Sequence, residues 1–127
     1  MIDVTCAIIW REGKVLTAQR GAKKHLAGKW EFPGGKVAAG ESLEECIVRE
    51  IEEELGCIVQ PLRRLSDSIY NYGDKQIRLI PFECDLVKGE PIAKEHATLM
   101  WCERATMQNL DWCEADISIV SEILSSR

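Results

Sequence analysis

Residues 35–57 read GKVAAGESLEECIVREIEEELGC, and this stretch predicts a single helix between two loops. Ser42 can accept a hydrogen bond from the first turn while Glu45 reaches back to the Ser42 N–H, the reciprocal pair called a capping box. Gly56 suits the left-handed residue that ends many helices, because it has no Cβ to strain there. We therefore expect a helix over 43–55.

The predicted helix carries an apolar stripe with three carboxylates beside it. At about 100° per residue one face collects the apolar side chains, namely Leu43, Cys46, Ile47, Ile51 and Leu55. Glu50 and Glu54 fall within or next to this stripe, and Glu53 lies on its border. Such carboxylates repel each other, at roughly 0.2–0.5 kcal/mol per pair on an exposed helix, and partial burial raises the cost. A bound divalent cation would offset this repulsion.

Residues 41–54 hold seven glutamates against one arginine, an imbalance that needs an explanation. One interpretation is a solvated acidic face without a ligand. The partly inward positions of Glu50 and Glu54 argue against it. Arg49 lies four residues before Glu53, where it can hold that carboxylate in one orientation. We therefore expect a Mg²⁺ site that binds a polyphosphate, since Mg²⁺ prefers carboxylate oxygens and keeps waters and substrate phosphates as ligands.

Outside this helix, strands outnumber helices. The expected strands span 4–10, 15–18, 57–70, 76–87 and 97–102, with a loop over 21–30. A last helix begins near Glu114 and places Ile117, Val120, Ile123 and Leu124 on one face. Because helices separate the strands irregularly, the pattern favours an α+β fold over a doubly wound sheet.

The chain of 127 residues has the composition of one soluble domain, with 46% hydrophobic and 29% charged residues. The apolar run over 6–10 is too short for a signal peptide or a membrane span, so we expect a cytoplasmic protein. A net charge of −5 disfavours nucleic acid and membranes as partners. Six cysteines without a C-x-x-C pair favour reduced thiols over a disulfide framework or a zinc site. We expect a monomer or weak dimer that binds a small molecule.

The central stretch also matches a known pattern. Gly35-x5-Glu41-x7-Arg49-Glu50-Ile51-x-Glu53-Glu54-x-Gly56-Cys57 resembles the Nudix box, G-x5-E-x7-R-E-U-x-E-E-x-G-U, where U is a bulky aliphatic residue. The one departure is Cys57 at the final aliphatic position, which affects packing rather than chemistry. Residues 31–36, EFPGGK, and 89–95, GEPIAKE, extend the resemblance to MutT-like nucleoside triphosphate pyrophosphohydrolases. The segments around 95–97, 101–102 and 115–117 look closest to their CTP pyrophosphohydrolase branch.

The resemblance implies a fold and a reaction. The fold is an α/β/α sandwich around a mixed sheet, with residues 1–127 forming a single domain. The reaction is attack of water on the β-phosphorus of a nucleoside triphosphate, which releases the monophosphate and pyrophosphate. The implied cofactor is Mg²⁺, with Mn²⁺ as a substitute. By carry-over, the metal ligands are the Gly34 carbonyl, Glu50, Glu53, Glu54 and Glu95. The catalytic set is Glu53 and Glu95, either of which could be the general base, with Arg49.

The resemblance also implies substrate-binding residues. Arg20 and Lys36 would hold phosphate oxygens, for which a guanidinium fork and an ammonium are suited; the alternatives are a surface arginine and a strand-edge lysine. Phe32 is either part of the base pocket or a core aromatic. His25 is either a substrate contact or a solvated loop residue.

Asp116 stands where MutT relatives place the asparagine that recognises oxidised guanine. An ionised aspartate only accepts hydrogen bonds, so it suits the amino group of cytosine and would repel the O6 of 8-oxoguanine unless protonated. This favours cytosine nucleotides over 8-oxo-dGTP. The alternative role for Asp116 is to cap the last helix.

Other functions remain open at this point. Within the Nudix fold, the substrate could be ADP-ribose or a dinucleoside polyphosphate, and Tyr72 lies roughly where enzymes of the second kind place a tyrosine. From another class, the chain could be a non-catalytic nucleotide-binding module. Such modules can lose the carboxylates, whereas this chain keeps all of them.

Overall fold

The computed structural model describes residues 1–126, which form eight strands and three helices. The strands are β1 (Ile2–Arg11), β2 (Lys14–Gln19), β3 (Trp30–Glu31), β4 (Gly34–Lys36), β5 (Ile58–Arg64), β6 (Ser68–Asn71), β7 (Gln76–Lys88) and β8 (Thr98–Cys102). The helices are α1 (Leu43–Leu55), α2 (Arg104–Met107) and α3 (Glu114–Ser125). The arrangement confirms the α+β prediction.

The strands form one mixed sheet with the order β3-β2-β1-β7-β5, in which β1 and β7 run parallel. β4 pairs with β1, β6 with β7, and β8 with β2, all antiparallel. β1 lies at the centre and is apolar on both faces: Cys6 and Ile8 enter one core cluster, while Ala7 and Ile9 enter the other. A strand covered on both sides is expected to lack polar alternation, which explains the continuous apolar run of β1.

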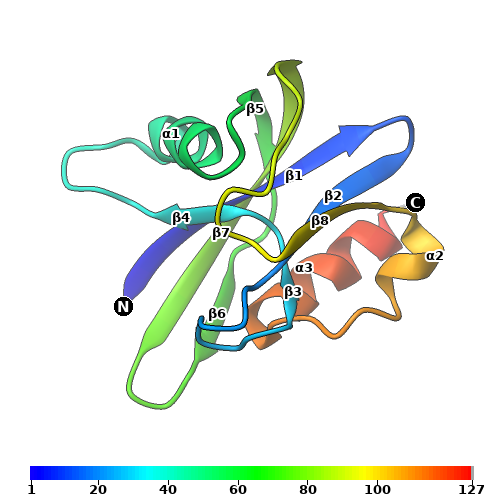
Figure 1. Ribbon diagram of the computed structural model, residues 1–127. Coiled ribbons are helices and arrows are strands. Elements are labelled where there is room, and N and C mark those ends of the chain that lie inside the picture. The colour runs from blue at the N-terminus through cyan, green and yellow to red at the C-terminus, as the bar shows by residue number, and fades with distance from the viewer. Residues whose placement is uncertain (127) are drawn as a thin grey trace.

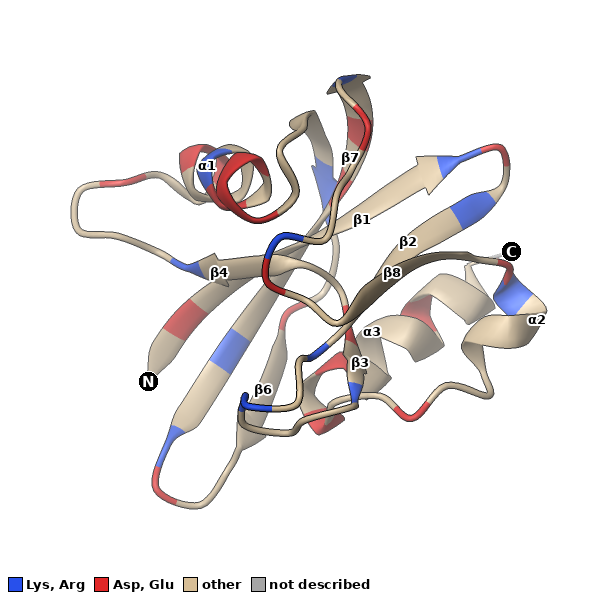
Figure 2. Ribbon diagram, viewed as in Figure 1, with Lys and Arg blue, Asp and Glu red and all other residues tan. Residues whose placement is uncertain are grey.

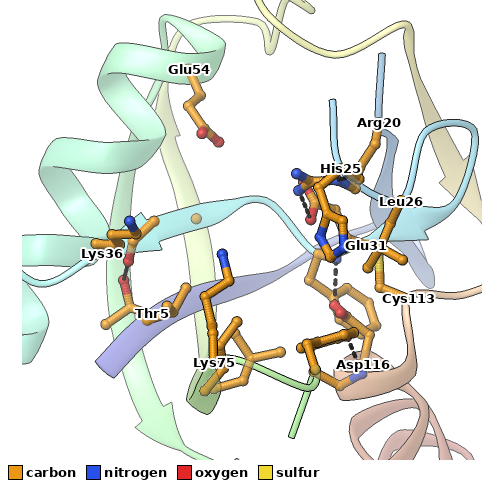
Figure 3. A pocket seen from close by; sticks show the side chains of 18 residues that line it. Thr5, Arg20, His25, Leu26, Glu31, Lys36, Glu54, Lys75, Cys113 and Asp116 are labelled. Carbon is orange, nitrogen blue, oxygen red and sulfur yellow. Dashed lines mark hydrogen bonds and ion pairs between the residues drawn. The ribbon is translucent and has the colours of Figure 1, made fainter. Parts of the chain in front are cut away.

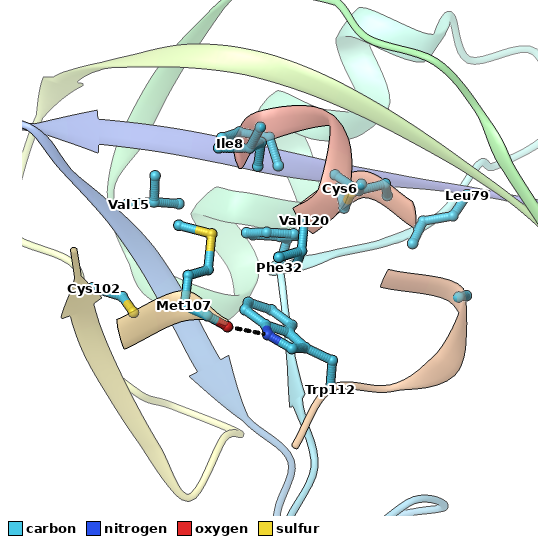
Figure 4. Close-up of a cluster of buried hydrophobic side chains, with 12 residues drawn as sticks. Cys6, Ile8, Val15, Phe32, Leu79, Cys102, Met107, Trp112 and Val120 are labelled. Atoms are coloured by element: carbon cyan, nitrogen blue, oxygen red, sulfur yellow. Dashed lines mark hydrogen bonds between the residues drawn. The ribbon is translucent and has the colours of Figure 1, made fainter. Parts of the chain in front are cut away.

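The two core clusters lie on opposite faces of the sheet, as the α/β/α prediction requires. Figure 1 shows α1 on one side and α3 with α2 on the other. Ile47, Ile51 and Leu55 of α1 pack against the first face. On the second face, Met107, Trp112 and α3 residues pack around Phe32, and the Trp112 indole donates to the Met107 carbonyl at 2.8 Å (Figure 4).

The bounds of α1 are those that the sequence predicts. Both hydrogen bonds of the Ser42–Glu45 capping box are present, at 2.9 and 3.0 Å. Gly56 takes the left-handed conformation with φ 71° and donates to the Glu52 carbonyl. The helix therefore begins and ends through local sequence signals.

Two sequence-based expectations need correction, and one helix was missed. Ile117 was expected on the buried face of the last helix, but it is 51% exposed, because α3 is rotated to bury Asp116, Ile119 and Ile123. The strand expected over 57–70 is divided into β5 and β6. The short helix α2 was not foreseen.

All six cysteines are free and buried. Cys57, at the aliphatic position of the pattern, is fully buried against the α1 face of the sheet. Within residues 1–126, no helix is long and apolar enough to span a membrane.

Candidate active site

Arg49 is the hydrogen-bonding hub of the acidic helix. Its Nε donates to Glu41 Oε2 at 2.6 Å, and its Nη1 donates to Glu50 and Glu53 at 3.0 and 3.1 Å. Its Nη2 reaches the Lys36 carbonyl at 3.2 Å, which ties α1 to the end of β4. Charge-assisted bonds of this kind are the stronger class of hydrogen bond. Arg49 therefore fixes the orientation of the carboxylates around it.

Glu41 orders the loop that precedes α1. Its Oε1 accepts from the Ala38 N–H at 2.9 Å, and both its oxygens accept from Arg49. These hydrogen bonds, first the one from the Arg49 side chain and then the one from the Ala38 backbone, lower the pKa of Glu41 to about 2. It is thus a permanently ionised partner for Arg49 near neutral pH.

Glu54 has the most unusual environment of the acidic group. Its Oε1 is buried and has no hydrogen-bond partner. Burial, reinforced by the charges of Glu31, Glu50 and Glu95 and opposed by His96, raises the pKa of Glu54 to about 7. A buried carboxylate oxygen without a partner is costly. A cation at this position would supply the missing partner.

Glu50 lies against the main chain of β4. Its side chain is 15% exposed, and a Cβ built on Gly35 would collide with its carboxyl group. Glycine at position 35 is therefore needed for this close approach. By contrast, the Glu53 side chain is 59% exposed. Of the three carboxylates that the sequence places beside the apolar stripe, Glu50 and Glu54 therefore lie inside the protein and Glu53 lies at the surface. Figure 2 shows the acidic residues gathered on α1.

The side chains of the acidic group are spread out. Among the residues that the structure describes, no three carboxylate, imidazole or thiol groups stand together in metal-binding positions. Glu50 and Glu53 each form an ion pair with Arg49. The residues still fit a hard divalent cation, because the set consists of oxygen donors and contains the unpartnered Oε1 of Glu54.

A pocket of about 230 Å³ joins the end of α1 to the start of α3 (Figure 3). It brings together Glu54, the predicted metal ligand Gly34 and all five residues predicted to bind substrate. These five are Arg20, His25, Phe32, Lys36 and Asp116. In Figure 3, Glu54 points toward the pocket from α1, and Asp116 lies at the opposite end. Glu50, Glu53 and Glu95 are not among the residues that line this pocket.

Asp116 is buried at that far end, 4% exposed. Its Oδ2 accepts from the main-chain N–H of Phe32 at 3.0 Å. Burial, followed by the charge of Glu31, raises the pKa of Asp116 well above its usual value, while the Phe32 N–H opposes the rise. Its predicted alternative role as the cap of α3 does not hold, since α3 begins at Glu114 and Asp116 lies inside it.

The Phe32 ring belongs to the core. It is 3% exposed and its centroid lies 4.8 Å from that of Trp112, although the residue also borders the pocket. His25 lies on the pocket rim, where its exposed ring packs edge-on against the ring of Tyr72, with 5.9 Å between the ring centroids. Tyr72 accepts from the Ala115 N–H through its hydroxyl, at 2.9 Å, which joins the rim to α3.

A second, smaller cavity of about 50 Å³ adjoins Glu54 and contains Glu95. Arg20, Glu31 and His96 also border it. Glu31 accepts from Arg20 Nη1 at 2.8 Å with one oxygen and contacts His96 Nε2 at 2.9 Å with the other. The predicted phosphate ligand Arg20 and the predicted metal ligand Glu95 therefore meet at one cavity.

Sequence reasoning missed three residues of the site: Glu31, Lys75 and His96. Glu31 stands in the quoted EFPGGK segment, and its position two residues before Pro33 was the available signal. Lys75 comes from the β6–β7 turn and its ammonium points into the pocket in Figure 3. No local pattern marks a turn lysine as a ligand.

Comparison with known proteins agrees with this geometry. The model of the NUDIX domain matches residues 1–122. The chain is 39% identical over 123 residues to a Mycobacterium tuberculosis protein provisionally named 8-oxo-dGTP diphosphatase 2, covering 94% of this chain and 86% of that one. It is 35% identical over 127 residues to the Escherichia coli CTP pyrophosphohydrolase, covering 100% and 94%.

A solved structure extends the likeness to the whole fold. The crystal structure of the MutT protein from Methanosarcina mazei Go1 superposes with a TM-score of 0.85 at 27% identity, covering 98% of this chain and 93% of that one. Proteins of this family generally use a divalent metal. The acidic helix, the pocket beside it and these matches lead to one conclusion: the chain belongs to the Nudix family and is a MutT-like hydrolase.

Proposed function

We propose that the protein hydrolyses a nucleoside triphosphate to the monophosphate and pyrophosphate in the presence of Mg²⁺. One observation carries this proposal: a single pocket extends from Glu54 of the acidic helix to the buried Asp116. A nucleotide has a matching polarity, with phosphates at one end and a base that can be hydrogen-bonded at the other. Lys36 and Arg20 border the pocket and suit phosphate oxygens.

Glu50, Glu53, Glu54, Glu95 and the Gly34 carbonyl are the residues that would hold the cation. When bound there, a divalent cation neutralises phosphate charge and lowers the pKa of a water molecule. The unpartnered Oε1 of Glu54 supports this assignment. Mn²⁺ has the same preference for carboxylate oxygens and is expected to substitute.

In the proposed reaction, water forms a bond to the β-phosphorus and the bond from that phosphorus to the α–β bridging oxygen breaks. The bridging oxygen leaves with the monophosphate, and the proton of the water passes to a carboxylate. Glu53 and Glu95 are both candidates for this general base, since their side chains are 59% and 53% exposed and can reach water. Arg49 supports Glu53 in this role through their 3.1 Å contact.

Asp116 is proposed to recognise the base. One of its oxygens is occupied by the Phe32 N–H, which leaves the other for the substrate. An ionised carboxylate would accept from the amino group of cytosine, so cytosine nucleotides, ribo or deoxy, are the first candidates. The 35% identity to a CTP pyrophosphohydrolase supports this choice.

8-Oxo-dGTP is the second candidate, and a specific observation favours it. Burial raises the pKa of Asp116, so the protonated carboxyl group forms more readily than in water. A protonated carboxyl can donate to O6 of an oxidised guanine, so the repulsion expected between an ionised aspartate and this oxygen does not arise. The 39% identity to a protein provisionally named for 8-oxo-dGTP points the same way.

The test is hydrolysis of a panel of substrates with Mg²⁺, with all phosphate-containing products separated by anion-exchange chromatography, because only the triphosphates can yield pyrophosphate. The panel contains CTP, dCTP, 8-oxo-dGTP, the remaining NTPs and dNTPs, ADP-ribose and diadenosine tetraphosphate. We expect the highest kcat/KM for a cytosine or oxidised-guanine triphosphate, with ¹⁸O from labelled water found in the pyrophosphate. Label in the monophosphate would refute attack at the β-phosphorus. Turnover of ADP-ribose or diadenosine tetraphosphate alone would move the protein to another Nudix class, and turnover of none would indicate a binding module.

A further inference from the structure

We infer that His96 is a positioning residue that fixes Glu95 at the acidic site. The inference rests on the proposed function, because Glu95 matters only if the carboxylates act together on a phosphate substrate. His96 does not touch the pocket that joins Glu54 to Asp116. Its effect passes through the neighbouring residue.

His96 is far less exposed to solvent than the other residues of its loop. Residues 92–97 are all exposed except His96. The His96 side chain is 6% exposed, whereas the side chain of Glu95 is 53% exposed. A loop with one buried side chain has its orientation set by that side chain. The direction in which Glu95 leaves the main chain therefore depends on where His96 is held.

His96 is held by the sheet through Glu31. The contact between His96 Nε2 and Glu31 Oε2 is 2.9 Å, and the other Glu31 oxygen accepts from Arg20 at 2.8 Å. With one oxygen given to each partner, Glu31 cannot turn without losing a charged bond. The ring of His96 is thereby fixed to β3.

Main-chain bonds fix the two sides of the loop but not its middle. Ile92 donates to the Leu55 carbonyl at 2.9 Å and Ala97 donates to the Gln19 carbonyl at 2.8 Å. Glu95 lies between these anchors, and its nearest cation is Lys24, at 3.9 Å. His96 is the side chain that completes the attachment and brings Glu95 to the cavity that also contains Glu54.

The other nitrogen of His96 argues against a purely packing role. Nδ1 is buried and has no hydrogen-bond partner. Leaving such a group unpaired is unfavourable, so an apolar side chain would serve packing alone at least as well. The histidine is explained by its Nε2 contact with Glu31.

The test combines substitutions at 96 and 95 in a double-mutant cycle. We expect His96→Leu to lower kcat on the best triphosphate by about tenfold, the lower end for residues that orient a site. His96→Gln, whose amide can donate to Glu31, should recover most of this loss. In the Glu95→Gln background, His96→Leu should lower kcat less than about twofold, because the residue it positions is gone. Equal losses in both backgrounds would overturn the inference.

Thr17→Val provides a matched structural control, because it removes one buried side-chain bond, from Thr17 to the Met100 carbonyl, and Thr17 lines neither cavity of the site. It should leave kcat unchanged. A loss of kcat in His96→Leu that is matched in Thr17→Val would show a general effect of stability and overturn the inference. The thermal midpoint of His96→Leu should stay within about 4 °C of the parent.

Hydrogen exchange separates this inference from the proposed function. Amides of residues 92–97 should exchange faster in His96→Leu than in the parent or in His96→Gln, whether or not any substrate is turned over. If the parent releases no pyrophosphate from the panel, the proposed function fails, but the exchange rates still report whether His96 holds the loop in place. Unchanged exchange in His96→Leu would show that His96 does not hold the loop, and the inference would fail alone.

Discussion

The two ends of the pocket are built in different ways. At the acidic end, Glu41, Arg49, Glu50, Glu53 and Glu54 come from one stretch of 14 residues, 41–54, and Arg49 donates hydrogen bonds to three of its carboxylates. At the base end, Phe32, Tyr72, Lys75 and Asp116 come from distant segments. Apart from Glu95 and the Gly34 carbonyl, the proposed chemistry therefore depends on one local segment, whereas the proposed base recognition depends on residues far apart in the sequence. Substitutions at the two ends should separate turnover from substrate choice.

The largest effect is expected at the acidic end. Glu53→Gln removes a negative charge from the proposed metal and general-base set, and should lower kcat by about 10³-fold or more on every substrate. Glu52→Gln is a matched control, because Glu52 is the exposed neighbour on the same helix. Steady-state kinetics with circular dichroism would check both. A mild loss in Glu53→Gln would remove that residue from the catalytic set.

A smaller and selective effect is expected from Asp116→Asn. The amide oxygen can still accept from Phe32, which turns the NH₂ group toward the base and makes it a donor. The ratio of kcat/KM for CTP to that for 8-oxo-dGTP should fall by about tenfold, as for the loss of one buried hydrogen bond. Competition assays with both substrates measure this ratio. Equal losses for both substrates would contradict the division between the two ends.

The two ends of the pocket differ in how much of their structure could be predicted from the sequence. The α1 helix was predictable in its bounds, because the Ser42–Glu45 box and Gly56 act within a few residues. The contact between Arg49 and Glu53 followed from their spacing. The environments of the carboxylates could not be predicted in this way, since the burial of Glu54 depends on β3 and on the loop before β8.

The structure of the base end could not be predicted from the sequence, because it depends on contacts between distant segments. Asp116 meets Phe32 because β3 lies along residues 111–113, with Trp30 donating to the Asp111 carbonyl and Cys113 to the Trp30 carbonyl. The periodicity of α3 placed Ile117 in the core, since a helical wheel gives no weight to a buried aspartate. The hydrogen bond from Phe32 accompanies the burial of Asp116, and no local sequence pattern contains it.

Lys75→Met should have a modest effect confined to binding. Lys75 points into the pocket from an exposed turn, and among residues 1–126 it makes no ion pair. We expect KM for the best triphosphate to rise about threefold with kcat unchanged, as for an exposed charge worth under about 1 kcal/mol. Lys14→Met, on an exposed position of β2, is the control. A fall in kcat would place Lys75 at the reacting phosphate instead.

The smallest effect concerns the stability of the acidic end. The folded pKa of Glu41 is about 2, below its ordinary value of 4.5. The stability that this carboxylate contributes is therefore complete above about pH 4.5 and is lost as the pH falls toward 2. Glu41→Gln should narrow the difference in thermal midpoint between pH 5 and pH 2.5. Parallel curves for parent and variant would show that Glu41 does not carry this dependence.

The bond from Phe32 to Asp116 has an evolutionary consequence, because its donor is a main-chain N–H. Mutation of residue 32 to any amino acid except proline leaves that donor in place. Position 116 can therefore exchange one hydrogen-bonding side chain for another and keep its anchor, while α1 is untouched. Gene duplicates of such a chain could diverge toward different nucleotides through few mutations, with the hydrolytic machinery inherited unchanged.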